Sequence, residues 1–140
     1  MPQRRFAFLS QRPKPRPEYL RLSFFRGDTR EPLSLQEAVQ AAQDCVGAEP
    51  WASQAAQDLG GWIRAAVKAP PARLWARPES RRPECWFKAA TPELKSRLYD
   101  LKAALEACGV EVMVERTRDP GRVVFEDEHQ IAAVPSRLRF

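Results

Sequence analysis

The sequence predicts an α+β fold built around a C-terminal β-α-β-β-β module, from about residue 85 to residue 134. Two observations predict this module. Apolar residues recur at steps of three and four between Thr91 and Cys108, which is the period of an amphipathic helix. After Val110 the period changes to two, which is the period of a strand with one buried face. We expect an N-terminal strand and two more helices to pack on this module.

The helix of the module carries recognisable start and stop signals. Thr91 is a favourable N-cap, and Pro92 takes the first helical position, where its missing N–H costs nothing. Gly109 supplies the left-handed conformation that ends many helices. The apolar stripe between them consists of Leu94, Leu98, Leu101, Leu105 and Cys108. Such a stripe predicts a helix that covers one face of a sheet.

Four strands complete the module, at residues 85–87, 110–114, 122–126 and 130–134. A right-handed β-α-β crossover is the simplest connection between the first strand and the second. Asp119-Pro120-Gly121 has the residues of a tight turn and leads into the last two strands. Residues 126–129 are expected to form the tip of the hairpin between those two.

Upstream of the module, the sequence predicts one strand and two helices. Tyr19 to Phe25 alternates as a strand does, and whether it joins the C-terminal sheet stays open. Ser34 and Glu37 form a capping box for a helix with the apolar face Leu35, Ala38, Val39, Ala42 and Val46. The next helix starts at Pro50, with the apolar face Trp51, Ala55, Leu59, Trp62 and Ala66. Gly60-Gly61 lies inside it and predicts a kink or a close packing contact.

Composition limits the class of protein. The chain has 140 residues, 44% of them hydrophobic and 29% charged, which fits one globular domain, here residues 18–140. No apolar run reaches the roughly 20 residues that cross a bilayer, and no signal peptide is evident. We therefore expect a cytoplasmic protein without a membrane partner. Three widely spaced cysteines and one histidine indicate buried thiols rather than disulfides or a zinc site, and no cofactor is expected.

Positive charge is concentrated in the first 17 residues. The formal net charge is +5, and this segment holds five basic residues and no acidic one: Arg4, Arg5, Arg12, Lys14 and Arg16. The 18 basic and 18 acidic residues of the remaining chain balance. Proline alternates with cations from Arg12 to Pro17, which predicts an extended arm that is disordered on its own.

A second basic segment is the proline- and arginine-rich connection at residues 69–84, which we expect to be a loop strapped to the surface. It carries the candidate binding residues Arg73, Trp75, Arg77, Arg81 and Arg82. Arginine beside tryptophan suits phosphate contact with base stacking, and equally suits a protein-interface hot spot. We expect Trp75 to be exposed or docked on a partner, and Trp51, Trp62 and Trp86 to belong to the core.

Carboxylates form two candidate sites for a divalent cation. The denser group is Glu126, Asp127, Glu128 and His129, although alternation along a strand separates neighbouring side chains and a polar hairpin tip explains the same residues. Glu111, Glu115 and Glu126 are the second set, of the kind found in nucleases. The chain has no lysine after Lys102 to complete such a site.

Three hypotheses for function follow. The first is a non-enzymatic binding protein, an accessory or regulatory subunit that docks on a larger protein or ribonucleoprotein through the arm, the 69–84 loop and Trp75. The second is a nucleic-acid-binding protein that places the same arginines on phosphates. The third is a metal-dependent hydrolase or toxin that uses Glu126, Asp127 and His129. The sequence contains no phosphate-binding glycine loop, Ser-His-Asp set or nucleotide fingerprint, which favours binding over catalysis.

Overall fold

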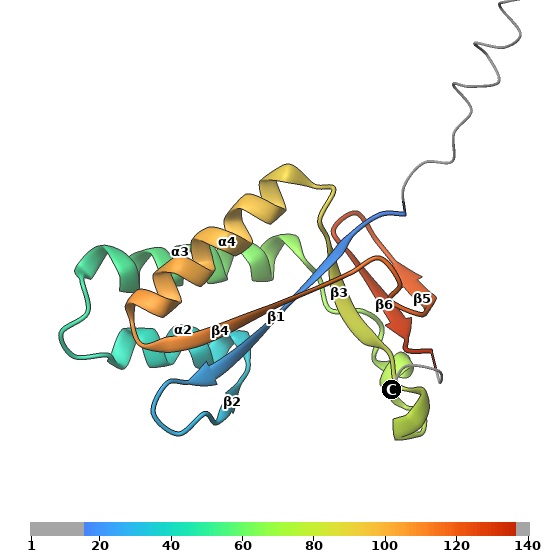
Figure 1. Ribbon diagram of the computed structural model, residues 1–140, viewed down its shortest axis with the longest axis horizontal. Helices are drawn as coiled ribbons and strands as arrows, with labels where there is room; N and C mark the ends of the chain where they lie inside the picture. Colours follow the sequence, from blue (N-terminus) through green and yellow to red (C-terminus); the bar gives the residue numbers. More distant parts are fainter. Residues whose placement is uncertain (1–15, 137–140) are drawn as a thin grey trace, which may run out of the picture.

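The computed structural model describes residues 16–136, in which three helices pack on a six-stranded antiparallel sheet (Figure 1). The α+β class and the predicted order of elements are confirmed. The strands are β1 (Tyr19–Arg26), β2 (Pro32–Leu33), β3 (Glu84–Lys88), β4 (Val110–Thr117), β5 (Arg122–Glu126) and β6 (Gln130–Val134). The helices are α2 (Leu35–Asp44), α3 (Pro50–Ala66) and α4 (Pro92–Ala107), with two short 3-10 helices, η1 (Ala72–Trp75) and η2 (Glu79–Arg81).

The N-terminal strand β1 lies inside the sheet, which answers the question that the sequence left open. One edge of β1 pairs with β4 along its whole length, from Tyr19 opposite Thr117 to Arg26 opposite Val110. The other edge pairs with β3 at its start and with β2 at its end. Because β3 and β4 are both antiparallel to β1, they run parallel to each other. The helical crossover between them therefore spans β1 rather than joining adjacent strands.

The C-terminal strands pair differently from a simple meander. β6 lies between β3 and β5, and the hairpin of β5 and β6 with its tip at residues 127–129 is confirmed. The predicted turn segment at residues 119–121 connects β4 and β5, and Gly121 has a positive φ of 103°. In the described part of the chain, however, the strands that it connects, β4 and β5, are not paired with each other.

Helix boundaries follow the predicted signals closely. The Ser34 hydroxyl accepts the Glu37 N–H at 3.1 Å and the Glu37 carboxylate accepts the Ser34 N–H at 3.0 Å, so the capping box is present. Gly109, at φ 82°, ends α4. Thr91 stands at the N-cap of α4, but its side chain makes no capping hydrogen bond.

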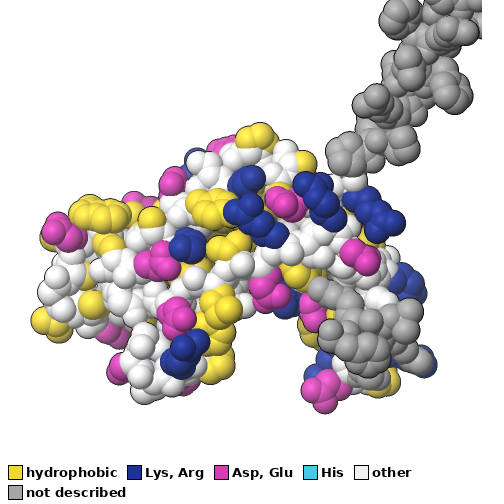
Figure 2. All heavy atoms as spheres, viewed as in Figure 1, with side chains coloured by type: hydrophobic (Ala, Val, Ile, Leu, Met, Phe, Trp, Pro, Cys, Tyr) yellow, Lys and Arg dark blue, Asp and Glu magenta, His cyan; other side chains and the backbone are white. Residues whose placement is uncertain are grey.

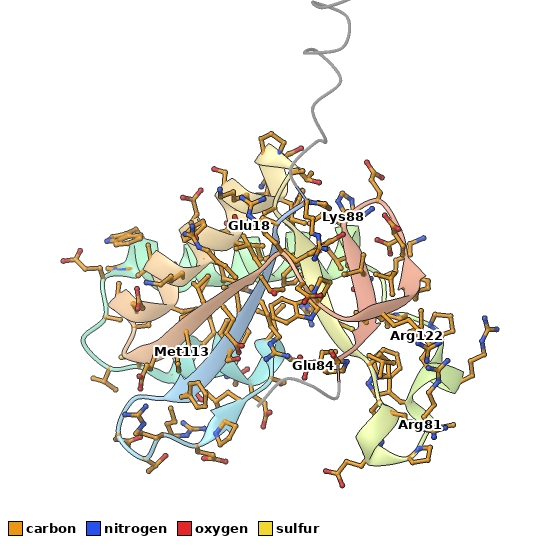
Figure 3. All side chains as sticks on the ribbon, turned by 45° about the vertical axis from the view of Figure 1, so that its right-hand side comes forward. Glu18, Arg81, Glu84, Lys88, Met113 and Arg122 are labelled. Carbon is orange, nitrogen blue, oxygen red and sulfur yellow. The ribbon has the colours of Figure 1, made fainter. Side chains whose placement is uncertain are left out.

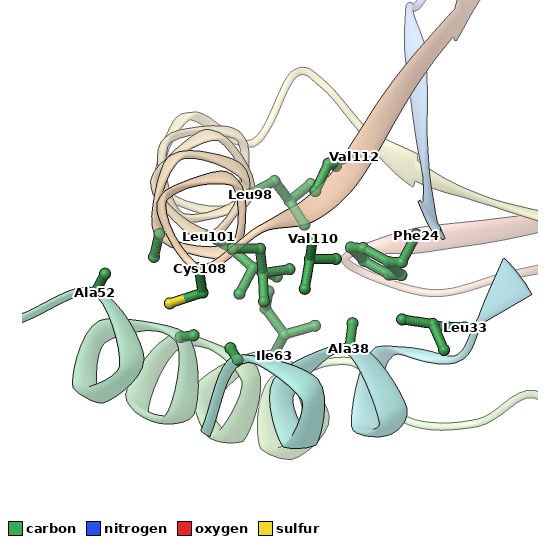
Figure 4. Packing of buried hydrophobic residues seen from close by; sticks show 14 of the residues in the cluster. Phe24, Leu33, Ala38, Ala52, Ile63, Leu98, Leu101, Cys108, Val110 and Val112 are labelled. Carbon is green, nitrogen blue, oxygen red and sulfur yellow. The ribbon is translucent and has the colours of Figure 1, made fainter. Parts of the chain in front are cut away.

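The main core lies between the helices and one face of the sheet (Figure 4). On β4, Val110 and Val112 are buried whereas Met113 is 48% exposed, as the alternation predicts. The leucine stripe of α4 is buried from Leu94 to Leu105. On the other face, Trp86 is only 1% exposed and packs with Ile131 and Ala133 in a second cluster.

Two predicted apolar positions are wrong. Trp51 is 56% exposed, because α3 turns its small residues Ala52, Ala56 and Gly60 toward the neighbouring helices instead. Val46 is also exposed, because α2 ends at Asp44 before reaching it. The predicted close contact at the glycine pair is confirmed, since a Cβ on Gly60 would lie 2.8 Å from Val39 Cγ2. In residues 16–136, no helix combines the length and hydropathy needed to cross a membrane.

Candidate functional site

The basic loop between α3 and β3 is held against the folded part, as predicted. Leu74 of η1 is 5% exposed, and Pro83 is buried just before β3 begins. Trp75 follows Leu74 and is 38% exposed. Leu74 therefore fixes the loop, while Trp75 remains available to a partner.

In the described chain the cations of this loop have no acidic partner, whereas most cations of the sheet and of α4 have one. Between residues 64 and 82 there are six basic residues and one acidic residue. None of these cations lies within 4.0 Å of an acidic side chain of the described chain: Arg64, Lys68, Arg73, Arg77, Arg81 and Arg82. Arg82 Nε instead donates to the carbonyl oxygen of Arg77 at 3.2 Å, which shapes the loop.

Most cations of the sheet and of α4 are compensated, whereas Lys95 and Arg116 of the described chain have no acidic side chain within 4.0 Å. Arg21 donates to the carboxylates of Glu84 and Glu115, and Lys88 pairs with Glu126. On α4, ion pairs one helical turn apart neutralise two further cations. The unpaired cations of the described chain are therefore most numerous between residues 64 and 82.

The sheet adds one more arginine to this surface, which the sequence did not predict. Ala133 of β6 pairs with Glu84 at the start of β3, and the next residue, Val134, pairs with Arg122 of β5. Arg122 consequently lies at the end of the sheet where the loop enters β3. Neighbouring strands are about 4.8 Å apart, so this residue and the end of the loop are separated by about 10 Å across β6.

A cavity of about 580 Å³ lies at this end of the sheet and is lined by Arg81, Arg122, Asp119, Gly121, Val134, Pro135 and Ser136. Figure 3 shows Arg81 and Arg122 on the same side of the molecule. No acidic side chain of residues 16–136 lies within 4.0 Å of either guanidinium. We call Arg73, Trp75, Arg77, Arg81, Arg82 and Arg122 the arginine surface.

The N-terminal arm and the arginine surface are not brought together by the described residues. The candidates Arg4, Arg5, Arg12 and Lys14 lie outside residues 16–136. Arg16 is exposed, and its carbonyl oxygen accepts a hydrogen bond from Arg118 Nη1 at 2.5 Å. It precedes Tyr19, which pairs with Lys88 at the end of β3, whereas the loop joins β3 at Glu84. Figure 3 shows Glu84 and Lys88 at opposite ends of this strand, about 13 Å apart from its rise per residue.

The acidic hairpin tip has a structural role. Asp127 Oδ1 accepts the backbone N–H groups of His129 and Gln130 at 2.9 and 3.0 Å, and Oδ2 accepts Gln130 Nε2 at 3.1 Å. Burial raises the pKa of Asp127, but these hydrogen bonds and the nearby His129 outweigh it, so that the pKa lies below its usual value. Glu126 is engaged with Lys88.

The metal candidates do not converge. In the described part of the chain, no three His, Cys, Asp or Glu side chains are placed to hold a metal ion. The carboxylates of the nuclease-type set each face a different cation: Glu111 faces Arg30, Glu115 faces Arg21, and Glu126 faces Lys88.

The three cysteines are free thiols. Cys108 is 4% exposed, in agreement with the predicted buried position, and burial raises its pKa. Cys85, on β3, is half-buried, and burial raises its pKa too. These two thiols are therefore protonated at neutral pH and are poor nucleophiles there.

No family model, curated protein or solved structure matches this chain. The interpretation of its function accordingly depends on its own geometry and charge.

Proposed function

We propose that this chain is a non-enzymatic binding protein, an accessory or regulatory subunit that docks through its arginine surface on an acidic part of a larger protein or ribonucleoprotein. The observation that carries the proposal is that, within residues 16–136, the loop cations and Arg122 have no acidic partners, whereas most sheet cations are paired. The cytoplasm is the compartment that we expect for it.

The chemistry of the surface supports this role. A guanidinium group offers a planar fork of donors that binds carboxylates and phosphates in a bidentate manner. Keeping several such groups unpaired on one loop costs self-repulsion, which an acidic partner relieves. Trp75 adds an apolar anchor beside them, and tryptophan and arginine are the residue types enriched at interface hot spots.

Direct binding to nucleic acid is the alternative, because the same arginines fit phosphates. The limited extent of the surface favours a protein contact, since Arg21 and Lys88 of the neighbouring sheet are neutralised by Glu84, Glu115 and Glu126. A nucleic-acid backbone would need an unpaired basic stripe that continues beyond one loop.

Two variants with equal loss of charge test the proposal. The loop variant carries Arg77→Gln, Arg81→Gln and Arg122→Gln, and the control variant carries Arg26→Gln, Arg30→Gln and Lys95→Gln. Each tagged protein is used to capture partners from native lysate at low and moderate salt, with and without nuclease. The bound proteins and nucleic acids are then identified and quantified. A truncated variant that starts at residue 18 measures the contribution of the arm in the same assay.

The outcomes separate the hypotheses. We expect one protein partner whose capture survives nuclease treatment, and which the control variant retains and the loop variant loses. Recovery of nucleic acid alone, falling steeply with salt, supports the nucleic-acid alternative instead. Equal recovery of the partner by both variants would refute docking through the arginine surface. If nothing is captured, divalent-dependent hydrolysis, with Asp127→Ala and His129→Ala as variants, becomes the hypothesis to assay.

A further inference from the structure

The sheet divides between β1 and β3. β1 and β3 pair only at Tyr19 opposite Lys88 and Leu20 opposite Phe87. Continuing that register would place Leu22 opposite Cys85, but within the described chain these two residues are not paired. Beyond Leu20, β1 runs toward β2 while β3 leads back to the basic loop, so the strands form a fork (Figure 1).

The fork leaves backbone hydrogen-bonding groups without strand partners at its opening. Successive residues of an antiparallel strand direct their N–H and C=O groups alternately to its two edges. Glu18 C=O accepts from Ala89, and Arg26 N–H donates to Glu31, so the even-numbered residues of β1 face the β3 and β2 edge. The backbone groups of Leu22 therefore point into the fork, and by the same alternation so do those of Cys85.

Two adjoining apolar cavities lie behind this opening, between the sheet and the helices. The larger has a volume of about 320 Å³ and is lined mainly by apolar side chains, among them Leu22, Phe24 and Leu98. The smaller has a volume of about 190 Å³ and reaches Arg64 and Gln130. Both are lined by Leu35, Ile63, Cys85 and Phe87, so they form one continuous cleft. Figure 2 shows the surface hollowed between the part that carries β2 and the part that carries the loop.

The charged groups of the cleft define what it can accept. No acidic side chain of residues 16–136 lines either cavity. Arg21 lines the larger one but is already engaged by Glu84 and Glu115. Arg64 lines the smaller one and has no acidic group of the described chain within 4.0 Å. The cleft thus has an apolar end in the larger cavity and an unpaired cation at the other end.

We infer that this cleft binds a single-chain amphipathic carboxylate, of the fatty-acid class, with its tail in the larger cavity and its carboxylate on Arg64. Small-molecule sites are typically apolar clefts of about 300–1,000 Å³ with a few polar groups that fix orientation, which describes this one. A cationic ligand is disfavoured, because Arg64 would repel it and no carboxylate of residues 16–136 lines the cleft. This inference is independent of the partner proposed for the arginine surface, which lies outside the cleft.

The test uses dodecanoate, below its aggregation concentration, and isothermal titration calorimetry on the full chain. Each buried methylene contributes about fourfold in affinity, so decanoate should bind on the order of tenfold more weakly than dodecanoate. Arg64→Gln should weaken dodecanoate on the order of tenfold through loss of a charge-assisted hydrogen bond. Lys68→Gln is the matched control, because Lys68 is a nearby unpaired cation that does not line the cleft, and it should leave the affinity unchanged.

Two further measurements locate the ligand. In a Cys45→Ser background, Cys85 is the thiol that lines both cavities. At alkaline pH, where more of this thiol is deprotonated, dodecanoate at saturation should slow its alkylation at least about tenfold. Leu35→Trp should fill the cleft and abolish binding, whereas Met113→Phe, on the opposite face of the sheet, should have no effect. The alkylation assay needs only the folded Cys45→Ser protein, so it shows whether the ligand occupies the cleft even if Leu35→Trp fails to fold.

Three results would overturn the inference. Unchanged alkylation of Cys85 at saturating dodecanoate would place the ligand elsewhere. Equal affinity for dodecanol and dodecanoate, insensitive to Arg64→Gln, would indicate an uncharged apolar occupant such as a protein segment. No detectable binding of dodecanoate to the original chain would remove this ligand class altogether.

Discussion

Gly60 of α3 faces Val39 of α2, and this contact offers a sharp test of the helix packing. A methyl group on Gly60 would lie 2.8 Å from Val39 Cγ2, so one of the two must move. The adjacent Gly61 has nothing within 4 Å of the same position. Gly60→Ala and Gly61→Ala therefore make the same chemical change on the same helix, in a crowded and in an open environment.

The expected effects follow from two opposing terms. Alanine stabilises a helix interior by about 0.5–1 kcal/mol relative to glycine, and Gly61→Ala should gain that amount in full. Overpacking a core contact costs about 1–3 kcal/mol, and the β-branched Val39 has little rotamer freedom with which to yield. The two variants should therefore differ by about 1–3 kcal/mol in free energy of unfolding, with Gly60→Ala the less stable.

Urea denaturation followed by far-ultraviolet circular dichroism measures this difference. Adding Val39→Ala should remove the clash, so a double-mutant cycle should give a favourable coupling energy between Val39→Ala and Gly60→Ala of at least about 0.5 kcal/mol. If Gly60→Ala stabilises the protein as much as Gly61→Ala does, α2 does not pack on α3 at this point and the helix layer described above is wrong.

Three further predictions concern stability. Gly121→Ala should lower the free energy of unfolding by more than about 2 kcal/mol in urea denaturation, because Gly121 has φ 103° and an added Cβ would lie 2.1 Å from the Val134 oxygen. A smaller loss would contradict the backbone conformation at Gly121. Asp127→Ala should lower the free energy of unfolding at pH 7 by about 1–3 kcal/mol through lost hydrogen bonds. The folded-state pKa of Asp127 lies below its usual value, so its stabilisation is present above that usual value and is lost as the pH falls through the folded pKa. The free energies of unfolding of the original protein and of Asp127→Ala should therefore converge in acid. A difference that persists in acid would refute the stabilising role of the Asp127 carboxylate. Leu101→Ala should cost about 2–5 kcal/mol by thermal or urea unfolding, since Leu101 is fully buried between α4 and the sheet; a loss below about 1 kcal/mol would place it outside the core.

Local signals in the sequence predicted the local structure well. The capping box at Ser34, the proline start of α3 and the glycine end of α4 each act within a few residues, so their effects can be read from neighbouring positions. The period of two in β4 and the positive φ of Gly121 are further local features that the sequence predicted.

Long-range pairing could not be predicted in this way. The place of β1 between β3 and β4 depends on contacts between segments far apart in the chain, and alternation reveals the faces of a strand but not its neighbours. The fork between β1 and β3, and the position of Arg122 beside the loop, follow only from that pairing.

The apolar face of α3 was predicted only in part: Leu59 and Trp62 pack against the core, but Trp51 is exposed. Counting large apolar residues includes Trp51 in the buried face, but three helices that pack closely need small residues at the contact. Ala52, Ala56 and Gly60 fill that role, and their spacing of four was the available signal.

The most direct test of the arginine surface replaces Trp75 by a photo-crosslinking aromatic residue in living cells. The matched control places the same residue at Trp51, which is more exposed, at 56% against 38%, but lies at the start of α3 away from the loop cations. Irradiation followed by mass analysis should give a protein adduct from position 75 and none from position 51. An adduct from position 51 alone would contradict docking through the arginine surface and place the partner on the helical end of the molecule.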